Sequence, residues 1–384
     1  MNNRSAWISA VIAVMLCGGC SYQLVIEKLL TVETIGYDKV DAKLGLDAPN
    51  NIVVTVSGPH ISEDGEDRRE AISTTASSSK EAKLYLSRRS DRIIVSGQLR
   101  TILYNEDIAR EGIYKISDSM LRDPQIGNRV KLTMVEGSSS KDFLSAQFKH
   151  DAKIDSFLHT MMEKEHQFNT IPMTTLHEFT RDYYDDGIDP IMPIIKKTKD
   201  FFMVSGIALF QDDRYITRIN PPETRVFLSM MDRYRHGDIS FNWKEPESSK
   251  QERLVLSFIA NKRKIEVLAQ REEPIQVTVA ISLKGYVLEY YGGHDLSKKE
   301  EQHAVEAQLE EQFERRAAAI IKQQQTHRVD NLGIGRYVRN SIGLNRWKQM
   351  NWREEFPNVK VTVKATVQIV GTGSRNFKPL PSKT

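Results

Sequence analysis

Two serine–lysine pairs are the first residues whose spacing could support covalent catalysis. Ser77 with Lys80, and Ser138 with Lys141, have the S-x-x-K spacing of penicillin-recognising enzymes, in which the serine is the nucleophile of an acyl transfer. Both pairs lie inside serine runs, where this spacing arises easily, and the S-D-N and K-T-G segments that complete such a site do not occur in the sequence. The sequence therefore gives little support to a serine-based enzyme.

Metal-dependent and acid–base chemistry are supported no better. His177-Glu178 begins the H-E-x-x-H pattern of zinc proteases, but Arg181 stands where the second histidine belongs. The aspartates between Asp182 and Asp189 do not have the spacing of a calcium-binding EF-hand loop, which favours a solvated acidic loop. Carboxylates elsewhere show no order, which leaves a glycosidase-type pair open. We predict no catalytic residues, no metal ligands, no cofactor and no enzymatic activity.

Cys20, near the N-terminus, is the one residue to which we assign a chemical modification. Arg4 is the only charge before Glu27, and an apolar run from Ala6 to Leu16 leads to Cys17-Gly18-Gly19-Cys20. A basic start, a short apolar run and small residues before a cleavage point are typical of an export signal. At ~1.5 Å per helical residue the run covers about half of a bilayer core, which is too short to span it well.

The residues before Cys20 resemble the lipobox of bacterial lipoproteins, although Cys17 stands where leucine is usual. The resemblance implies that residues 1–19 are a signal peptide, and that Cys20 becomes the first residue of the mature chain with a diacylglycerol and an N-acyl lipid attached. A two-chain anchor of this kind holds a protein firmly to a membrane. The alternative is an uncleaved anchor helix over the uncharged stretch from Ser5 to Ile26.

The composition excludes several classes of protein. In 384 residues, 54 Lys and Arg against 51 Asp and Glu leave a net charge of only +3, so a nucleic-acid-binding protein is disfavoured. Two cysteines rule out a disulfide scaffold and a multi-thiolate zinc site. Beyond the N-terminus no uncharged run is long enough for a second membrane span.

The hydrophobic patterns predict an α+β protein with three mixed α/β domains and an elongated shape. We place an N-terminal domain at residues 20–198, a small middle domain at 199–249 and a C-terminal domain at 250–384, because an acidic connector marked by glycine and proline runs from Asp185 to Pro193. The strongest helix prediction covers residues 295–325, where Val305, Leu309 and Phe313 begin an apolar stripe.

Shorter patterns predict the remaining elements. We expect a hairpin over 201–219, a helix from Pro221 to about Met231, a helix capped by Asp330 that runs to about Lys348, and a loop over Pro59–Arg69. Other predicted strands cover residues 29–38, 52–57, 92–104, 131–136, 239–243, 254–259, 265–268, 275–288 and 359–370, and other predicted helices cover 80–89, 106–121, 141–148 and 151–165.

Several segments, taken in this order behind a lipobox, resemble the Ger(x)C family, the C-subunit lipoproteins of bacterial spore germinant receptors. The segments are Ile35–Asp38, Ile108–Gly112 with Leu121–Pro124, Gly206–Phe210, and a closing block that contains Asp330, Leu332, Gly333, Gly335, Trp347, Trp352, Phe356, Pro357 and Gly371. The resemblance covers nearly all of the mature chain. One stretch departs from it: Ser21–Glu27 replaces the Trp-Asp-Arg-Arg-Glu-like residues that usually follow the lipid cysteine.

The resemblance implies a non-enzymatic subunit on the outer face of the spore's inner membrane, acting with two integral-membrane subunits in nutrient-triggered germination. It leaves open whether this chain binds a small molecule and whether it is a diverged paralogue. We interpret Gly36, Gly206 and Gly371 as backbone-geometry positions, and Trp352 and Phe356 as packing residues. The alternatives are a lipid-anchored extracytoplasmic solute-binding protein and, with less support, a cell-wall enzyme.

Overall fold

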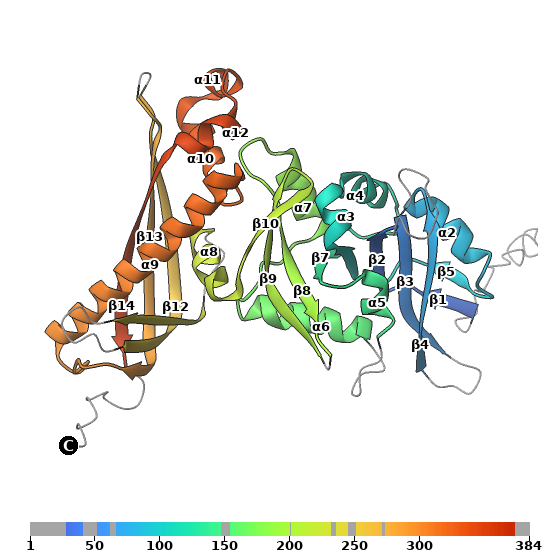
Figure 1. Cartoon of the computed structure of the whole chain (residues 1–384), viewed down its shortest axis with the longest axis horizontal. Coiled ribbons are helices and arrows are strands. Elements are labelled where there is room, and N and C mark those ends of the chain that lie inside the picture. The colour runs from blue at the N-terminus through green and yellow to red at the C-terminus, as the bar shows by residue number, and fades with distance from the viewer. Residues whose placement is uncertain are drawn as a thin grey trace, which may run out of the picture.

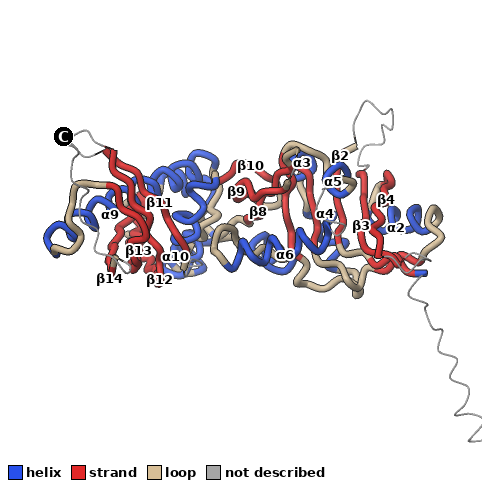
Figure 2. The backbone as a smooth tube through the Cα atoms, turned by 90° about the horizontal axis from the view of Figure 1, so that it is seen from below, coloured by secondary structure: helices blue, strands red, loops and turns tan. Residues whose placement is uncertain are grey.

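The computed structural model describes residues 28–40, 52–61, 67–146, 154–199, 201–231, 236–244, 251–270 and 273–372. The predicted signal peptide and Cys20 lie outside these residues. The described chain is elongated and α+β, as predicted, and consists of two bodies arranged side by side (Figures 1 and 2). The first body is built on an eight-stranded sheet, and the second body is built on a four-stranded sheet.

The eight-stranded sheet has the order β10-β9-β8-β7-β6-β2-β3-β4. Its centre is parallel, from β2 through β6 and β7 to β8, and antiparallel pairs complete both sides. The strands are β2 (Thr34–Lys39), β3 (Ile52–Ile61), β4 (Asp67–Ala76), β6 (Thr101–Asn105), β7 (Lys131–Glu136), β8 (Ile191–Lys197), β9 (Phe202–Gln211) and β10 (Arg214–Ile219). A separate small parallel pair joins β1 (Leu29–Thr31) to β5 (Ile93–Val95).

Helices cover both faces of this sheet and bury its central strands on both sides. On β6, Ile102 and Tyr104 belong to one apolar cluster and Leu103, between them, belongs to another. The first cluster includes residues of α2 (Ser79–Ser87), α3 (Glu106–Glu111), α4 (Tyr114–Leu121) and α7 (Leu176–Tyr184). The second includes residues of α5 (Ser140–Leu144) and α6 (Ile154–Gln167). Runs buried on both faces are typical of parallel strands.

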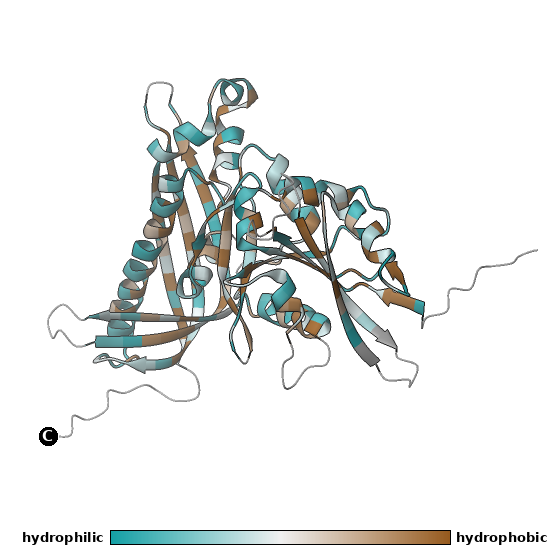
Figure 3. Ribbon diagram, turned by 45° about the vertical axis from the view of Figure 1, so that its right-hand side comes forward, coloured by the Kyte–Doolittle hydropathy of each residue, from teal (hydrophilic) through white to brown (hydrophobic). Residues whose placement is uncertain are grey.

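The second body packs one long helix across a sheet of the order β11-β12-β13-β14. The strands are β11 (Gly237–Lys244), β12 (Gln251–Leu268), β13 (Gln276–Tyr291) and β14 (Lys360–Gly371), and the helix is α9 (Lys299–His327). The predicted stripe of α9 is buried at Val305, Leu309 and Phe313. Figure 3 shows hydrophobic and hydrophilic residues alternating along the helix and the strands beside it, as expected for elements with one buried face.

Shorter helices lie between β10 and β11 and between α9 and β14. They are the 3₁₀ turn η3 (Pro221–Glu223), α8 (Thr224–Met230), α10 (Ile334–Ile342), α11 (Leu344–Lys348), α12 (Trp352–Glu355) and the 3₁₀ turn η4 (Phe356–Asn358). The apolar core of the second body continues into the first, where it includes Ile191, Ile207, Leu209 and Ile219. The two bodies therefore share one apolar core.

Several predictions about elements need correction. The predicted helix 106–121 is two helices, α3 and α4, and the predicted strand 92–104 is two strands, β5 and β6. The helix predicted from Asp330 to about Lys348 is two helices, α10 and α11, separated at Gly343. Strand β8 begins at Ile191, inside the predicted connector. Part of the predicted loop Pro59–Arg69 is strand, since β3 continues to Ile61 and its antiparallel partner β4 begins at Asp67. The predicted strands 254–259 and 265–268 are one strand, β12, which has a bulge between Phe258 and Ala260. Helix α7 has no predicted counterpart, although its capping box of Thr175 and Glu178 is legible in the sequence.

The proposed middle segment, residues 199–249, contributes to both sheets. Its predicted hairpin is confirmed as β9 and β10, which complete one side of the eight-stranded sheet, and β11 forms an edge of the four-stranded sheet. The helix after Pro221 is confirmed as η3 and α8. The division of the chain into three domains stays a prediction.

Candidate functional site: the junction around Asp330

Members of the two serine–lysine pairs contact other residues. The backbone N–H and the hydroxyl of Ser77 donate to the Glu81 carboxylate, and Lys80 forms an ion pair with Asp123. The N–H of Lys141 donates to the Asp38 carboxylate. The neighbouring serines Ser78 and Ser139 cap α2 and α5. Among the described residues, no group of three or more histidine, cysteine or acidic side chains is arranged to hold a metal ion. No helix in the described ranges is long and apolar enough to cross a membrane.

The segment Ile35–Asp38 positions the start of α5. The carboxylate of Asp38 accepts hydrogen bonds from the backbone N–H groups of Ser140 (2.5 Å) and Lys141 (2.9 Å). Burial raises the pKa of Asp38, and these hydrogen bonds partly offset the increase. A Cβ atom on Gly36 would lie 2.7 Å from the Cβ of Ser140. The glycine therefore allows α5 to pack directly on β2.

The segment Ile108–Gly112 docks α3 against the turn between β9 and β10. Gly112 has a φ of +118°, and a Cβ there would lie 2.6 Å from the carboxylate of Asp213. That aspartate accepts hydrogen bonds from the N–H groups of Ile113, at its backbone oxygen, and Tyr114, at its carboxylate. The Arg110 guanidinium lies 4.5 Å from the centre of the Tyr215 ring, a cation–π contact.

The closing block of the resemblance gathers around the buried side chain of Asp330. Its carboxylate accepts hydrogen bonds from the N–H groups of Ile334 (3.0 Å) and Gly335 (2.6 Å), which confirms that it caps the following helix. It also accepts a hydrogen bond from Nε1 of Trp352 at 3.0 Å. Burial raises the pKa of Asp330 to about 7, against the effect of these donors.

Asp330 also meets the acidic connector of the first body. The N–H of Asp189 donates to the backbone oxygen of Asp330 (2.9 Å), and the N–H of Asp330 donates to the carboxylate of Asp189 (2.8 Å). Burial raises the pKa of Asp189 as well. The Asn331 side-chain amide donates to the backbone oxygens of Pro190 and Phe210. The hydrogen bonds of Asp189, Asp330 and Asn331 thus join the two bodies.

Two glycines let the backbones approach at this junction. The N–H of Arg336 donates to the backbone oxygen of Gly187 at 3.1 Å. A Cβ on Gly187 would lie 2.6 Å from the nitrogen of Arg336, and a Cβ on Gly335 would lie 2.6 Å from Nε1 of Trp352. Trp352 itself packs between Trp347 and Phe356, with ring centres 5.6 and 5.4 Å away. The packing roles predicted for Trp352 and Phe356 are confirmed.

Arginines of the second body form ion pairs with Asp182 of α7 and with Asp185 of the connector. Arg336 binds Asp182 (2.8 Å) and Asp185 (2.7 Å), and Arg339 binds Asp185 (2.7 Å). Although burial acts to raise the pKa of Asp185, hydrogen bonds from Arg339 and Gly187 and the nearby guanidinium charges lower it. The predicted solvated acidic loop is therefore wrong at three positions: Asp182 and Asp185 lie in an inter-body ion-pair network, and Asp189 is buried against Asp330.

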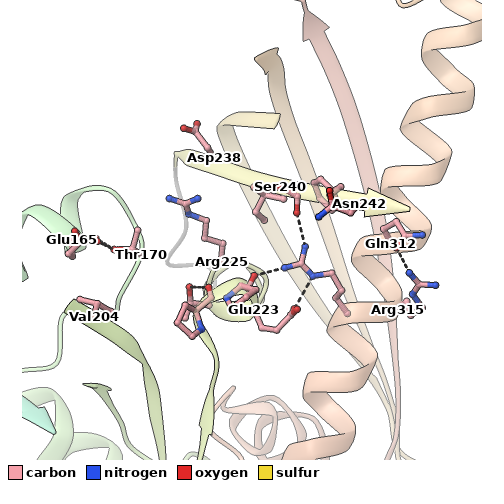
Figure 4. A pocket seen from close by; sticks show the side chains of 16 residues that line it. Glu165, Thr170, Val204, Glu223, Arg225, Asp238, Ser240, Asn242, Gln312 and Arg315 are labelled. Atoms are coloured by element: carbon pink, nitrogen blue, oxygen red, sulfur yellow. Dashed lines mark hydrogen bonds and ion pairs between the residues drawn. The ribbon is translucent and has the colours of Figure 1, made fainter. Parts of the chain in front are cut away.

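Two hollows border the contact between the bodies. One of ≈ 680 Å³ is bordered by Asp186, Asp212, Lys348 and Arg353; Arg353 closes part of its rim by pairing with Asp212 at 2.9 Å. A second, of ≈ 580 Å³, has Glu165 and Thr170 of the first body on one side and Gln312 and Arg315 of α9 on the other (Figure 4).

In this second hollow the charged groups also hold the walls together. Arg316 donates to the Glu223 carboxylate at 2.9 Å and to the Ser240 backbone oxygen at 3.3 Å. Thr170 donates to Glu165, and Arg315 donates to Gln312. The Arg316 contacts join η3, β11 and α9.

The comparisons with known proteins identify the class of protein. The family model described as spore germination protein N-terminal domain matches residues 22–197, and the one described as spore germination B3/GerAC like, C-terminal, matches residues 205–373. The spore germination protein GerQC of Bacillus cereus is 24% identical over 369 residues, 96% of this chain and 98% of that protein. The chain is therefore a spore germination protein built from the two domain types of that class.

A solved structure supports the same fold. The crystal structure of the GerBC protein matches with a TM-score of 0.59 at 13% identity, and the match covers 88% of this chain and 96% of that one. The chain belongs to the Ger(x)C family, the C subunits of spore germinant receptors, and the resemblance drawn from its motifs is confirmed. Of the motif residues, Asp330, Gly335 and Trp352 lie at the inter-body junction.

Proposed function

We propose that this chain is a non-enzymatic, lipid-anchored receptor subunit, tethered through a diacylglycerol and an N-acyl chain on Cys20 to the outer face of the spore's inner membrane. In this proposal it acts with two integral-membrane subunits in nutrient-triggered germination. The observation that carries the proposal is the pairing of a lipobox-like Cys17–Cys20 with two germination-protein domains over residues 22–197 and 205–373.

The use of the motif and connector carboxylates supports a non-enzymatic role. The motif residues Asp38 and Asp330 accept hydrogen bonds from backbone N–H groups, as does Asp189 of the connector, and Asp185 of the connector pairs with two arginines. A general acid or base must instead be free to exchange a proton with a substrate. The motif carboxylates are therefore suited to fixing the shape of the molecule, as a subunit that transmits contact between partners requires.

Fractionation of spores tests the tether. A tagged chain with Cys20 and a Cys20→Ala variant are expressed in a spore former, and the spore membranes are separated from soluble material. We expect the Cys20 form in the membrane fraction, with an N-terminal peptide whose mass includes the lipid, and the variant mainly in the soluble fraction. Equal membrane recovery of both forms, without lipid on Cys20, would contradict the tether.

A further inference from the structure

The four-stranded sheet of the second body has one open face. Inward-pointing residues of β13 and β14, such as Ile281 and Val367, are buried in the core with α9, and α8 and α10 contribute to that same core. The residues between them point the other way. On β14 all of these outward residues from Lys360 to Val370 are exposed. We call this side of β12, β13 and β14 the outer face.

Lysines dominate the outer face between the levels of Gln276 and Tyr286. Lys264 pairs across β13 with Ala280, which pairs with Lys364, so these two lysines stand in one row. The lysines of this stretch are Lys262, Lys264, Lys284, Lys360 and Lys364. Its single carboxylate, Glu266, is 2.6 Å from Lys264. The described part of this stretch is therefore strongly basic.

Small side chains separate the lysines of β13 and β14. The outward positions between them are Thr278, Ala280, Ser282, Thr362 and Thr366. Charges spread over three strands suit a broad negative surface better than a single phosphate or carboxylate, because several lysines can contact such a surface at once.

An exposed apolar cluster adjoins the lysines at one end of the face. Tyr286 is 43% exposed, Leu288 48%, Ile259 52% and Val370 40%. The pairing of β12 with β13 and of β13 with β14 shifts register at this level, through Phe258/Ala260 and Gly285/Tyr286. A Cβ on Gly371 would lie 3.1 Å from the Tyr286 ring, so the ring extends over this glycine toward β14.

We propose that the outer face binds the surface of an anionic phospholipid bilayer. The lysines would contact the headgroups, where each basic residue strengthens binding roughly fivefold, and the cluster around Tyr286 would enter the interfacial layer, in which tyrosine is favoured. The first described strand, β1, and this sheet lie at opposite ends of the molecule (Figure 1). Lipid contact here therefore gives a second attachment, remote from the N-terminal tether.

Binding to vesicles tests the proposal without the tether. Residues 20–384 with Cys20→Ala are mixed with vesicles of phosphatidylcholine alone, or of phosphatidylcholine with phosphatidylglycerol, and sedimented at low and at high salt. We expect preference for the anionic vesicles, weakened by salt because the lysines are exposed. Combined K262E, K264E and K364E substitutions should weaken binding at least about tenfold, and Tyr286→Ala should weaken it with little change in thermal stability.

The matched control reverses three exposed lysines on the helical side, K299E, K322E and K348E, and should bind as the parent does. Equal binding by the two triple variants, or no preference for anionic vesicles, would overturn the proposal. So would a sheet variant that binds vesicles normally but loses the integral-membrane subunits, because the face would then dock a protein. A failed tether would leave these results unchanged, since Cys20 is absent from the assay.

Discussion

Asp189 and Asp330 hold the two bodies together by reciprocal hydrogen bonds, although they are far apart in the sequence. The N–H of Asp189 reaches the backbone oxygen of Asp330 at 2.9 Å, and the N–H of Asp330 reaches the carboxylate of Asp189 at 2.8 Å. Asp330 in turn caps α10 and accepts from Trp352. One buried carboxylate thus couples a helix start, an aromatic cluster and the inter-body contact.

The stability of the junction should fall as pH rises. The pKa of Asp330 is about 7 in the fold and 3.8 without it, so the folded state binds the proton more tightly. Its stabilising contribution is full below pH ~4 and is lost as pH rises through ~7. At ~1.4 kcal/mol per pH unit, the free energy of unfolding falls by ~4 kcal/mol across this window from Asp330 alone.

Urea denaturation at pH 5 and pH 8 measures this effect. Asp330→Asn removes the titrating group and should be less stable than wild type but should lose less stability between the two pH values. Groups shared by both proteins, such as His159, whose pKa is lowered by burial, cancel in the comparison. Identical pH dependence in the two proteins would show that Asp330 does not titrate in this range.

Alanine at Gly187 should loosen the joint. Its Cβ would lie 2.6 Å from the nitrogen of Arg336 and 2.9 Å from the carbonyl carbon of Gly335, so one backbone must move, at a cost of ~2 kcal/mol or more. Gly127→Ala is the matched control, because a Cβ there meets nothing within 4 Å. Thermal unfolding measures both, and equal melting temperatures would contradict the close approach.

The effects of substituting Arg336 and Asp185 on stability should not be additive, because the two side chains form an ion pair. Arg336→Met leaves the buried Asp182 with fewer partners, and we expect a loss of ~1–3 kcal/mol in the free energy of unfolding. Combined with Asp185→Asn, the loss should be smaller than the sum of the single losses by ~1 kcal/mol, as for residues in one network. Strict additivity in this double-mutant cycle would indicate that the pair contributes nothing.

The apolar stripe of α9 should dominate the stability of the second body. Phe313 is fully buried, so Phe313→Ala should cost ~3–5 kcal/mol. Glu311→Ala, at an exposed position of the same helix, should change stability by less than ~0.5 kcal/mol. A comparable effect of the two substitutions on the denaturation midpoint would mean that the stripe does not face the sheet.

Local patterns in the sequence predicted most of the helices and strands. They did not predict the contacts between residues that are far apart in the chain. Helix α9 was predictable because its apolar residues recur at steps of three and four, and the cap at Asp330 because the acceptor lies only four residues before the first residue of the helix it caps. The partnership of Gly187 with Gly335 joins residues that only the fold brings together, and a single sequence contains no record of it. Asp330 was therefore named as a cap, whereas its contact with Asp189 was missed.

Charged strands were the other source of error. The second half of β12 reads Asn261-Lys262-Arg263-Lys264, and its lysines belong to the outer face, so the buried alternation weakens there. Strand β4 lies at the edge of the eight-stranded sheet, where charged residues are common because they discourage pairing with other chains. Because both segments are rich in charged residues, their sequences alone do not indicate strands.

Co-purification from spores tests the central claim most directly. The tagged chain is recovered from detergent-solubilised inner membrane, in the Cys20 and Cys20→Ala forms, and the proteins that accompany it are identified by mass spectrometry. The account predicts two multi-span membrane subunits with the Cys20 form and a marked loss of both with Cys20→Ala. Recovery of the Cys20 form from the membrane without such subunits would contradict the receptor-subunit role and would favour a solute-binding protein or a cell-wall enzyme.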